Sequence, residues 1–278
     1  MNGTTIQTVP SSLYVMGRTS AEYQRLRHQA QIWEPATAAL LDRIGLVRGM
    51  ACLDVGSGPG EVMRLMGQRV GASGRVVGVD LDRKLGHEAL NVLRATQLSQ
   101  FDFVEGDLQT LTNIPGAPFD VVYARLLLIH TPDPCAMLQT MLRWVKPGGY
   151  LVVQDYDLCS LDAYPVCAPL EEFKRVCYSV FQHAGRDIQM GRKLPWYFRE
   201  AGLGAADGTD VAGILAPMDQ SWEMVATTYQ SVLPLALKLG ITTQAQSEEF
   251  FQQIKAAPQH GTAVLWPLLV GAWKRKLT

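Results

Sequence analysis

The chain has 278 residues, of which 47% are hydrophobic and 18% charged, and its formal net charge is -1 at pH 7. It contains no apolar run near the roughly 18 residues of a membrane-spanning helix, its polar first residues lack the pattern of a secretory signal, and its charge offers little attraction to nucleic acid. We therefore expect a cytoplasmic protein that acts on small molecules, without a membrane or nucleic acid among its partners.

Two helices are predicted to open the chain. Residues 19–22 read Thr-Ser-Ala-Glu, which is the spacing of a capping box, and apolar residues then recur at helical intervals as far as Trp33. Pro35 favours the start of a second, short helix, and Gly45 is typical of its end. We expect residues 1–49 to form a helical cover, which can also reach a neighbouring copy and make a homo-oligomer.

From residue 50, short apolar runs alternate with longer segments of helical periodicity, as in strand–helix units. The apolar runs are continuous, which indicates a parallel sheet covered on both faces. The expected strands are residues 51–55, 75–79, 102–105, 119–124 and 150–154, and the expected helices are residues 61–70, 83–98 and 134–145.

After residue 157 the pattern is mostly helical, with helices expected at 170–183, 191–201, 222–239 and 243–254. A weak strand is expected at 205–211 and a last one at 264–273, where Pro267 favours an edge or a bulge. The whole indicates an α/β protein with a Rossmann-like, doubly wound, mostly parallel seven-stranded sheet. Residues 50–278 would form this domain, and a helical insertion at about 215–260 would lie over its ligand-binding edge.

The strongest local signal is a glycine-rich turn between the first strand of this sheet and the helix after it. Residues 52–61 read Cys-Leu-Asp-Val-Gly-Ser-Gly-Pro-Gly-Glu, with glycines at 56, 58 and 60. Glycine lets the backbone approach a ligand with positive φ, and the helix N-terminus offers N–H groups to it. The same turn can also be a tight strand–helix connection that binds nothing.

Two further strands end in acidic residues at the same expected edge. Asp80 ends the second strand, where a doubly wound nucleotide site places the carboxylate that accepts from ribose hydroxyls. The third strand runs into Glu105-Gly-Asp107-Leu108, and Asp107 can accept from an amino group such as that of adenine. The three strand ends would therefore line one crevice.

In this order the segments resemble the class I S-adenosylmethionine-dependent methyltransferases. The likeness spans about residues 50–155 and includes Leu-Asp-Val-Gly-Ser-Gly-Pro-Gly at 53–60, Val-Asp at 79–80, Gly-Asp-Leu at 106–108, Phe-Asp-Val-Val at 119–122 and Lys-Pro-Gly-Gly at 146–149. It implies S-adenosylmethionine as the cofactor and the following contacts. The three glycines and Asp54 would lie at the methionine part, Asp80 at the ribose, Leu81 on the adenine face, and Asp107 with Leu108 at the adenine edge.

The flanks resemble a subgroup of methyltransferases that acts on quinones and small natural products. Residues 14–18, Tyr-Val-Met-Gly-Arg, followed by Glu22, Arg25, Leu26 and Gln29, are similar to a helical cover over the cofactor in that subgroup, and residues 191–195 and 200–203 also match. Within it the chain resembles C-methyltransferases that modify indole rings. This resemblance implies an aromatic natural product as the acceptor, methylated at carbon, nitrogen or oxygen.

Methyl transfer from a sulfonium needs positioned reactants rather than a covalent catalyst. His130, shortly after the fourth strand, is a candidate general base, and it can equally cap the turn at 131–134. Tyr156, just past the fifth strand, can stack on or hydrogen-bond the acceptor, or belong to the core.

Other polar and aromatic residues are weaker candidates for cofactor binding. Arg125 can approach the cofactor carboxylate or pair with a surface acid. Tyr14 can close over the sulfonium or anchor the N-terminal tail, and Gln29 can bond the cofactor or face solvent. The five cysteines form no CxxC pair, and nothing shows that Asp155 and Asp157 meet a metal, so we expect no metal and no disulfide framework.

Two other functions share parts of this pattern. A nicotinamide-dependent oxidoreductase would use a similar glycine turn and Asp80, but its fingerprint is G-x-G-x-x-G, whereas the glycines here alternate at 56, 58 and 60. A methyltransferase-like protein can also bind the cofactor without transferring the methyl group, because fold alone does not fix activity.

Overall fold

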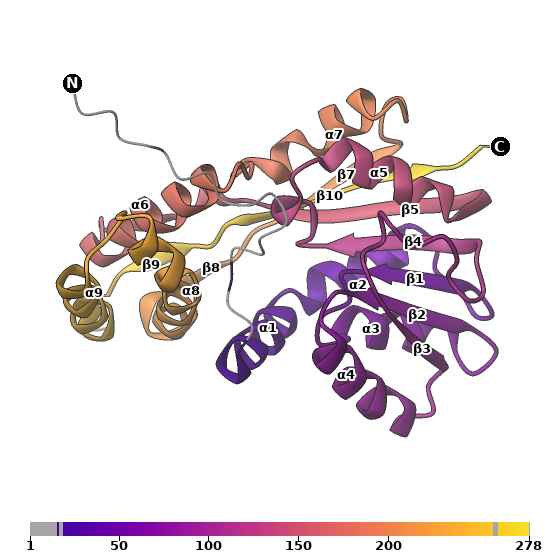
Figure 1. The fold of residues 1–278 in the computed structure, drawn as a ribbon, viewed down its shortest axis with the longest axis horizontal. Coiled ribbons are helices and arrows are strands. Elements are labelled where there is room, and N and C mark those ends of the chain that lie inside the picture. The colour runs from indigo at the N-terminus through magenta and orange to yellow at the C-terminus, as the bar shows by residue number, and fades with distance from the viewer. Residues whose placement is uncertain (1–15, 17–18, 258–260, 278) are drawn as a thin grey trace.

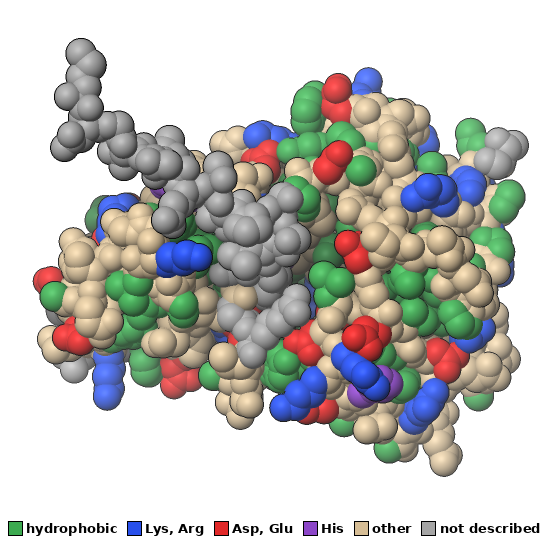
Figure 2. All heavy atoms as spheres, in the orientation of Figure 1, with side chains coloured by type: hydrophobic (Ala, Val, Ile, Leu, Met, Phe, Trp, Pro, Cys, Tyr) green, Lys and Arg blue, Asp and Glu red, His purple; other side chains and the backbone are tan. Residues whose placement is uncertain are grey.

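The computed structural model describes residues 16, 19–257 and 261–277, so the predicted contact of Tyr14 lies outside the described part. Figure 1 shows a sheet with helices on both of its faces, joined to a helical cap at its left. None of the described helices is long and apolar enough to cross a bilayer. Acidic and basic side chains are interspersed on the face seen in Figure 2, in keeping with the net charge of -1.

The main sheet confirms the predicted fold class. Its seven strands run in the order β3-β2-β1-β4-β5-β10-β7, parallel from β3 to β5, while β10 is antiparallel to both β5 and β7. The strand order reverses between β1 and β4, and open α/β sheets bind ligands at such a point. The strands are β1 Ala51–Val55, β2 Arg75–Asp80, β3 Gln100–Glu105, β4 Phe119–Arg125, β5 Val145–Asp157, β7 Gly208–Ala212 and β10 Leu268–Arg275.

Helices cover both faces because neighbouring strand residues point to opposite sides. In β1, Leu53 belongs to the apolar cluster that contains Met137 of α5, whereas Cys52 belongs to the cluster that contains Leu40 of α2. This two-sided burial explains the continuous apolar runs. The helices around the sheet are α1 Ser20–Ile32, α2 Glu34–Arg43, α3 Glu61–Val70, α4 Arg83–Ala95, α5 Pro134–Arg143 and α7 Met190–Glu200.

The cap draws on more of the chain than the expected insertion. It contains α6 Ala168–His183, α8 Met218–Lys238 and α9 Gln244–Ala256, together with a second sheet in the order β6-β9-β8. Between α8 and α9, Tyr229 stacks on Phe250 with 3.8 Å between ring centroids. The strands of this sheet are β6 Asp162–Tyr164, β8 Leu215–Pro217 and β9 Ala263–Leu265, and two short 3-10 turns, Leu128–His130 and Leu158–Ser160, precede it.

Three local expectations need correction. The last predicted strand is split at Trp266 and Pro267, so that β9 joins the small sheet and only β10 joins the main one. The expected turn at 146–149 lies inside β5, where the pairing with β4 shifts between Phe119 and Val121. The capping box at α1 is half formed: the Thr19 side chain accepts from the Glu22 amide, but the Glu22 carboxylate binds Arg25 instead.

Gly67→Ala is expected to lower the free energy of unfolding by about 1–3 kcal/mol, because it overpacks the contact between α3 and β3. A Cβ atom at residue 67 would lie 2.3 Å from Cζ of Phe101, whose side chain is buried. The gain in helix propensity, about 1 kcal/mol, offsets part of this loss. Urea unfolding followed by circular dichroism measures the difference.

The control for this change is Phe101→Leu, which removes the ring that Gly67→Ala would strike. In the Phe101→Leu background, Gly67→Ala should cost much less, and the double-mutant cycle gives the packing energy. An equal cost in both backgrounds would contradict the packing explanation.

Candidate active site

A cavity of about 720 Å³ lies where the carboxyl ends of the central strands face the cap. Its size is within the range of about 300–1,000 Å³ that is usual for small-ligand pockets. Helix α1 lies along it, between the sheet and the cap (Figure 1). The residues singled out from the sequence that line the cavity are Glu22, Arg25, Leu26, Gln29, Asp54, Gly56, Gly58, Asp80, Leu81, Asp107, Leu108, Arg125, His130 and Tyr156.

The glycine loop forms the floor of the cavity next to β1. Gly56, Gly58 and Gly60 have φ of +70°, +48° and +81°, a conformation that residues with a Cβ rarely adopt. A Cβ on Gly58 would come no nearer than 4.0 Å to another atom, so this glycine is open to the cavity. Gly60 does not line it: it caps α3, and a Cβ atom on it would lie 3.0 Å from the Cβ of Ala89 in α4. The expected ligand contact of Gly60 is therefore not part of this cavity wall.

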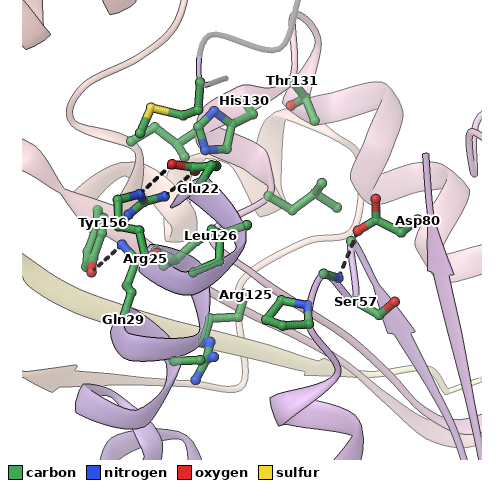
Figure 3. Close-up of a pocket in the computed structure, with 18 of the residues that line it drawn as sticks. Glu22, Arg25, Gln29, Ser57, Asp80, Arg125, Leu126, His130, Thr131 and Tyr156 are labelled. Carbon is green, nitrogen blue, oxygen red and sulfur yellow. Dashed lines mark hydrogen bonds and ion pairs between the residues drawn. The ribbon is translucent and has the colours of Figure 1, made fainter. Parts of the chain in front are cut away.

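The acidic residues at the strand ends meet at this loop. The Gly58 amide donates to Oδ2 of Asp80 over 2.8 Å, as the dashed line in Figure 3 shows, and the Asp82 amide donates to Oδ1 over 2.8 Å. Leu81 between them is 54% exposed and lines the cavity. Asp107 reaches the same space from the end of β3, and Leu108 next to it is buried.

Asp54 is a buried carboxyl at the cavity wall. Burial raises its pKa to about 7, with the negative charge of Asp80 adding to the rise and Arg125 opposing it. Its Oδ2 has no hydrogen-bond partner among the described residues. A cationic ligand group at this place would supply the missing partner and favour the ionised carboxylate.

Arg125 ends β4 on the same side of the cavity. Its Nη1 donates to the hydroxyl of Thr37 over 2.9 Å, so Arg125 is held by α2 rather than by the surface acid that was one of the two expectations. The guanidinium still lines the cavity beside Asp54 and can reach a ligand carboxylate there.

Tyr156 lies within β5 rather than past its end, and its ring is buried against α1. Its hydroxyl accepts from Trp33 Nε1. It also accepts from Gln29 Nε2 over 3.1 Å, as Figure 3 shows. Gln29 therefore points inward and does not face solvent. Burial raises the pKa of Tyr156 to about 12, which keeps its hydroxyl protonated and able to donate one further hydrogen bond.

His130 ends the turn after β4 and faces the cavity. Burial, together with the positive charges of Arg25 and Arg186, lowers its pKa to about 3. The imidazole is thus neutral at pH 7, and this pKa does not suit a general base, which works best with a pKa near the operating pH. The catalytic role of His130 stays a prediction. Its position supports a neutral imidazole in the cavity wall that can form a hydrogen bond with a ligand.

Two residues of the expected helical cover, Glu22 and Arg25, form a buried ion pair at the cavity, a pairing that the sequence did not predict. Arg25 Nε and Nη2 donate to both carboxylate oxygens of Glu22 over 2.8 and 2.6 Å, and both side chains are almost fully buried. The hydroxyl of Ser231 in α8 also donates to Glu22. Arg186, which is 5% exposed, lines the cavity from the loop after α6. Nothing in the local sequence distinguishes Arg186 from a surface arginine.

Asp155 and Asp157 have separate structural partners. Asp155 accepts from the amides of Ile129 and Tyr156, while Asp157 pairs with Arg192. Within the described ranges, no group of three or more His, Cys, Asp or Glu side chains is placed to hold a metal ion.

Comparisons with known proteins all point to one family, the methyltransferases. Residues 25–205 match the family model described as a methyltransferase domain. The chain is 26% identical over 211 residues to the demethylmenaquinone methyltransferase of Lactococcus lactis, covering 69% of this chain and 82% of that protein. It is also 26% identical over 238 residues to methyltransferase GfsG of Streptomyces halstedii, covering 85% of this chain and 80% of that one.

A solved structure has the same fold over nearly its whole length. A protein of Bacillus halodurans C-125 that is assigned as a methyltransferase superimposes with a TM-score of 0.58 and 19% identity, covering 87% of this chain and 99% of that chain. At this identity the likeness shows the fold alone.

Tyr156→Phe is expected to lower the free energy of unfolding by about 1–3 kcal/mol, because the buried Nε1 of Trp33 loses its acceptor. Thermal and urea unfolding measure the change. Trp33→Phe removes the donor, so Tyr156→Phe should cost clearly less in that background. A cost that is the same with and without Trp33 would show that the hydrogen bond does not hold α1 on β5.

Proposed function

The chain belongs to the methyltransferase-domain family and uses S-adenosylmethionine to methylate a small molecule, and we propose that this acceptor is an aromatic natural product. The observation that carries this proposal is the cavity itself. It joins an acidic, glycine-lined sheet edge to an aromatic wall on the cap side in one continuous space.

The sheet edge fits the cofactor. We assign Asp54 to the amino group, because its buried Oδ2 has no other hydrogen-bond partner among the described residues, and Arg125 to the carboxylate of the methionine part. We assign Asp80, whose oxygens accept from the amides of Gly58 and Asp82 at the end of β2, to the ribose hydroxyls. Leu81 offers an exposed apolar surface to the adenine ring, and Asp107 with Leu108 lies at the adenine edge.

The opposite side of the cavity suits an aromatic acceptor. Flat rings are held well by aromatic side chains, through stacked and edge-to-face contacts. The relative named demethylmenaquinone methyltransferase is named for a ring-bearing acceptor, which agrees with this reading. The aromatic residues of this wall are Tyr156, Phe173, Tyr178, Phe181 and Trp266.

In this proposal the residues of the chain promote the reaction by orienting the two substrates, without forming a covalent bond to either. When bound, the cofactor would supply an electrophilic methyl group, and the residues of the cap would position the acceptor beside it and exclude water. The hydroxyl of Tyr156 and the neutral ring of His130 can orient the acceptor through hydrogen bonds. The methylated atom in this proposal is carbon, nitrogen or oxygen, and an indole ring is one proposed acceptor.

Cofactor affinity is expected to rise with pH between about 5.5 and 7.5, because Asp54 has a raised pKa of about 7 and must lose its proton to bind an ammonium group. Below pH 7 each unit of pH should weaken binding by up to about tenfold. Asp54→Asn should bind S-adenosylmethionine more weakly and with a flatter pH dependence. Isothermal titration at constant ionic strength measures both.

Asp155 is also buried with a pKa raised to about 7, so it is the competing source of such a pH dependence. It does not line the cavity, and Asp54→Asn leaves it unchanged. Parallel pH curves for the two proteins would therefore contradict the assignment of Asp54.

Purified protein with S-adenosylmethionine should release S-adenosylhomocysteine in the presence of an aromatic acceptor, and the acceptor should gain 14 Da, about the mass of one CH₂ group, since the wall binds rings. A panel of indoles, phenols and quinols, with aliphatic alcohols and amines as controls, tests this by mass spectrometry. Cofactor binding without turnover would favour the non-transferring alternative. Methylation of aliphatic compounds alone would refute the aromatic acceptor.

A further inference from the structure

The aromatic wall of the cavity has few polar hydrogens, and most of them are bound inside the protein. The hydroxyl of Tyr178 donates to the Leu158 carbonyl, and Nε1 of Trp266 donates to the Ser221 hydroxyl over 3.0 Å. Two further members of the wall are phenylalanines, whose rings carry no polar hydrogen. Among these aromatic residues, Tyr156 alone keeps a polar hydrogen that no described residue accepts.

The Tyr156 hydroxyl lies between two donors. Nε1 of Trp33 donates to its oxygen, and so does Nε2 of Gln29 over 3.1 Å, the bond drawn as a dashed line in Figure 3. A hydroxyl oxygen has two lone pairs, so these two bonds occupy both of them. Burial raises the pKa of this group to about 12, so the hydrogen stays on the oxygen at neutral pH. Toward a ligand, the hydroxyl can therefore only donate.

This hydroxyl belongs to the cavity wall rather than to the closed core. Tyr156 and Gln29 both line the cavity, whereas Trp33 is buried and does not line it. Trp33 holds the tyrosine from the protein side, in an edge-to-face contact with 5.8 Å between the ring centroids. A buried donor without an acceptor costs free energy, and a ligand oxygen in the cavity would supply the missing acceptor.

We propose that the aromatic acceptor carries a carbonyl oxygen, which accepts the hydrogen of the Tyr156 hydroxyl and thereby fixes where the ring lies in the cavity. This rests on the proposed function and deepens it to aromatic compounds with a carbonyl group on the ring. A carbonyl oxygen accepts without bringing a hydrogen of its own, whereas a hydroxyl or an amine brings one that the Tyr156 oxygen has no lone pair left to accept. Trp33 and Gln29 act through Tyr156, as positioning residues that make its hydroxyl a donor.

The test compares two ligands of the same shape, acetophenone and α-methylstyrene, in which a CH₂ group replaces the carbonyl oxygen. Each is titrated by calorimetry into protein saturated with S-adenosylhomocysteine, so no turnover takes place. The hydrocarbon leaves water more readily, and the measured quantity is therefore the change that a variant causes in each affinity. Tyr156→Phe should weaken acetophenone binding by about three- to tenfold and leave α-methylstyrene binding nearly unchanged.

Two variants of Gln29 keep the hydroxyl and test its direction. Gln29→Glu replaces the amide donor by a carboxylate that accepts the Tyr156 hydrogen, so acetophenone should again bind about three- to tenfold more weakly. Gln29→Met removes the donor and takes no hydrogen, so the acetophenone affinity should stay within about twofold of that of the unchanged protein. Gln31→Glu adds the same charge at an exposed position of α1 outside the cavity, and should change neither affinity. Retained S-adenosylhomocysteine binding shows that each variant is folded.

The proposal is overturned if Tyr156→Phe changes both affinities equally, or if Gln29→Glu leaves acetophenone binding unchanged. The two proposals fail separately. Methylation of aromatic compounds by a protein in which ketone binding does not depend on Tyr156 would refute the carbonyl alone. Ketone binding that depends on Tyr156 and Gln29, in a protein that methylates no aromatic compound, would refute aromatic methylation alone.

Discussion

The hydrogen bond from the Gly58 amide to the Asp80 carboxylate holds the two strand ends on which the site depends. The parallel pairing of β1 with β2 ends where Val55 lies beside Val79. The bond from Gly58 to Asp80 continues the contact between the two strands into the loop that follows β1. The amides of Gly56 and Ser57 both donate to the Val79 carbonyl, so the loop is fixed by backbone as well as by the carboxylate. A rigid loop can present its open side to a ligand without losing conformational entropy on binding.

Much of this half of the molecule was predictable from the sequence, because its elements obey simple periodicities. The strands of a parallel sheet that is covered on both faces are continuous apolar runs, and predicted strand 51–55 and helix 61–70 coincide with β1 and α3. Asp80 and Asp107 were predictable as neighbours because parallel strands end at one edge. The cofactor side of the cavity follows from these local signals.

The cap and the acceptor side could not be predicted in the same way. The strands of the small sheet have three residues each, too few to show alternation, and they pair over long stretches of chain, as Asp162 of β6 does with Leu265 of β9. The Glu22–Arg25 pair is buried where α1 meets α8, and Arg186 is buried in the loop after α6. Such burial is a property of the assembled fold, and charged residues are otherwise mostly exposed.

Helix α1 touches both halves of the cavity through separate bonds. The Tyr23 hydroxyl donates to Asp82 beside the glycine loop over 2.6 Å, while Glu22, one residue away, accepts from Ser231 of the cap. A ligand that stabilises α1 from one side therefore prepares it for the other, and thermodynamic reciprocity makes that effect mutual. The two substrates of this protein should bind with positive cooperativity, communicated through a single turn of helix.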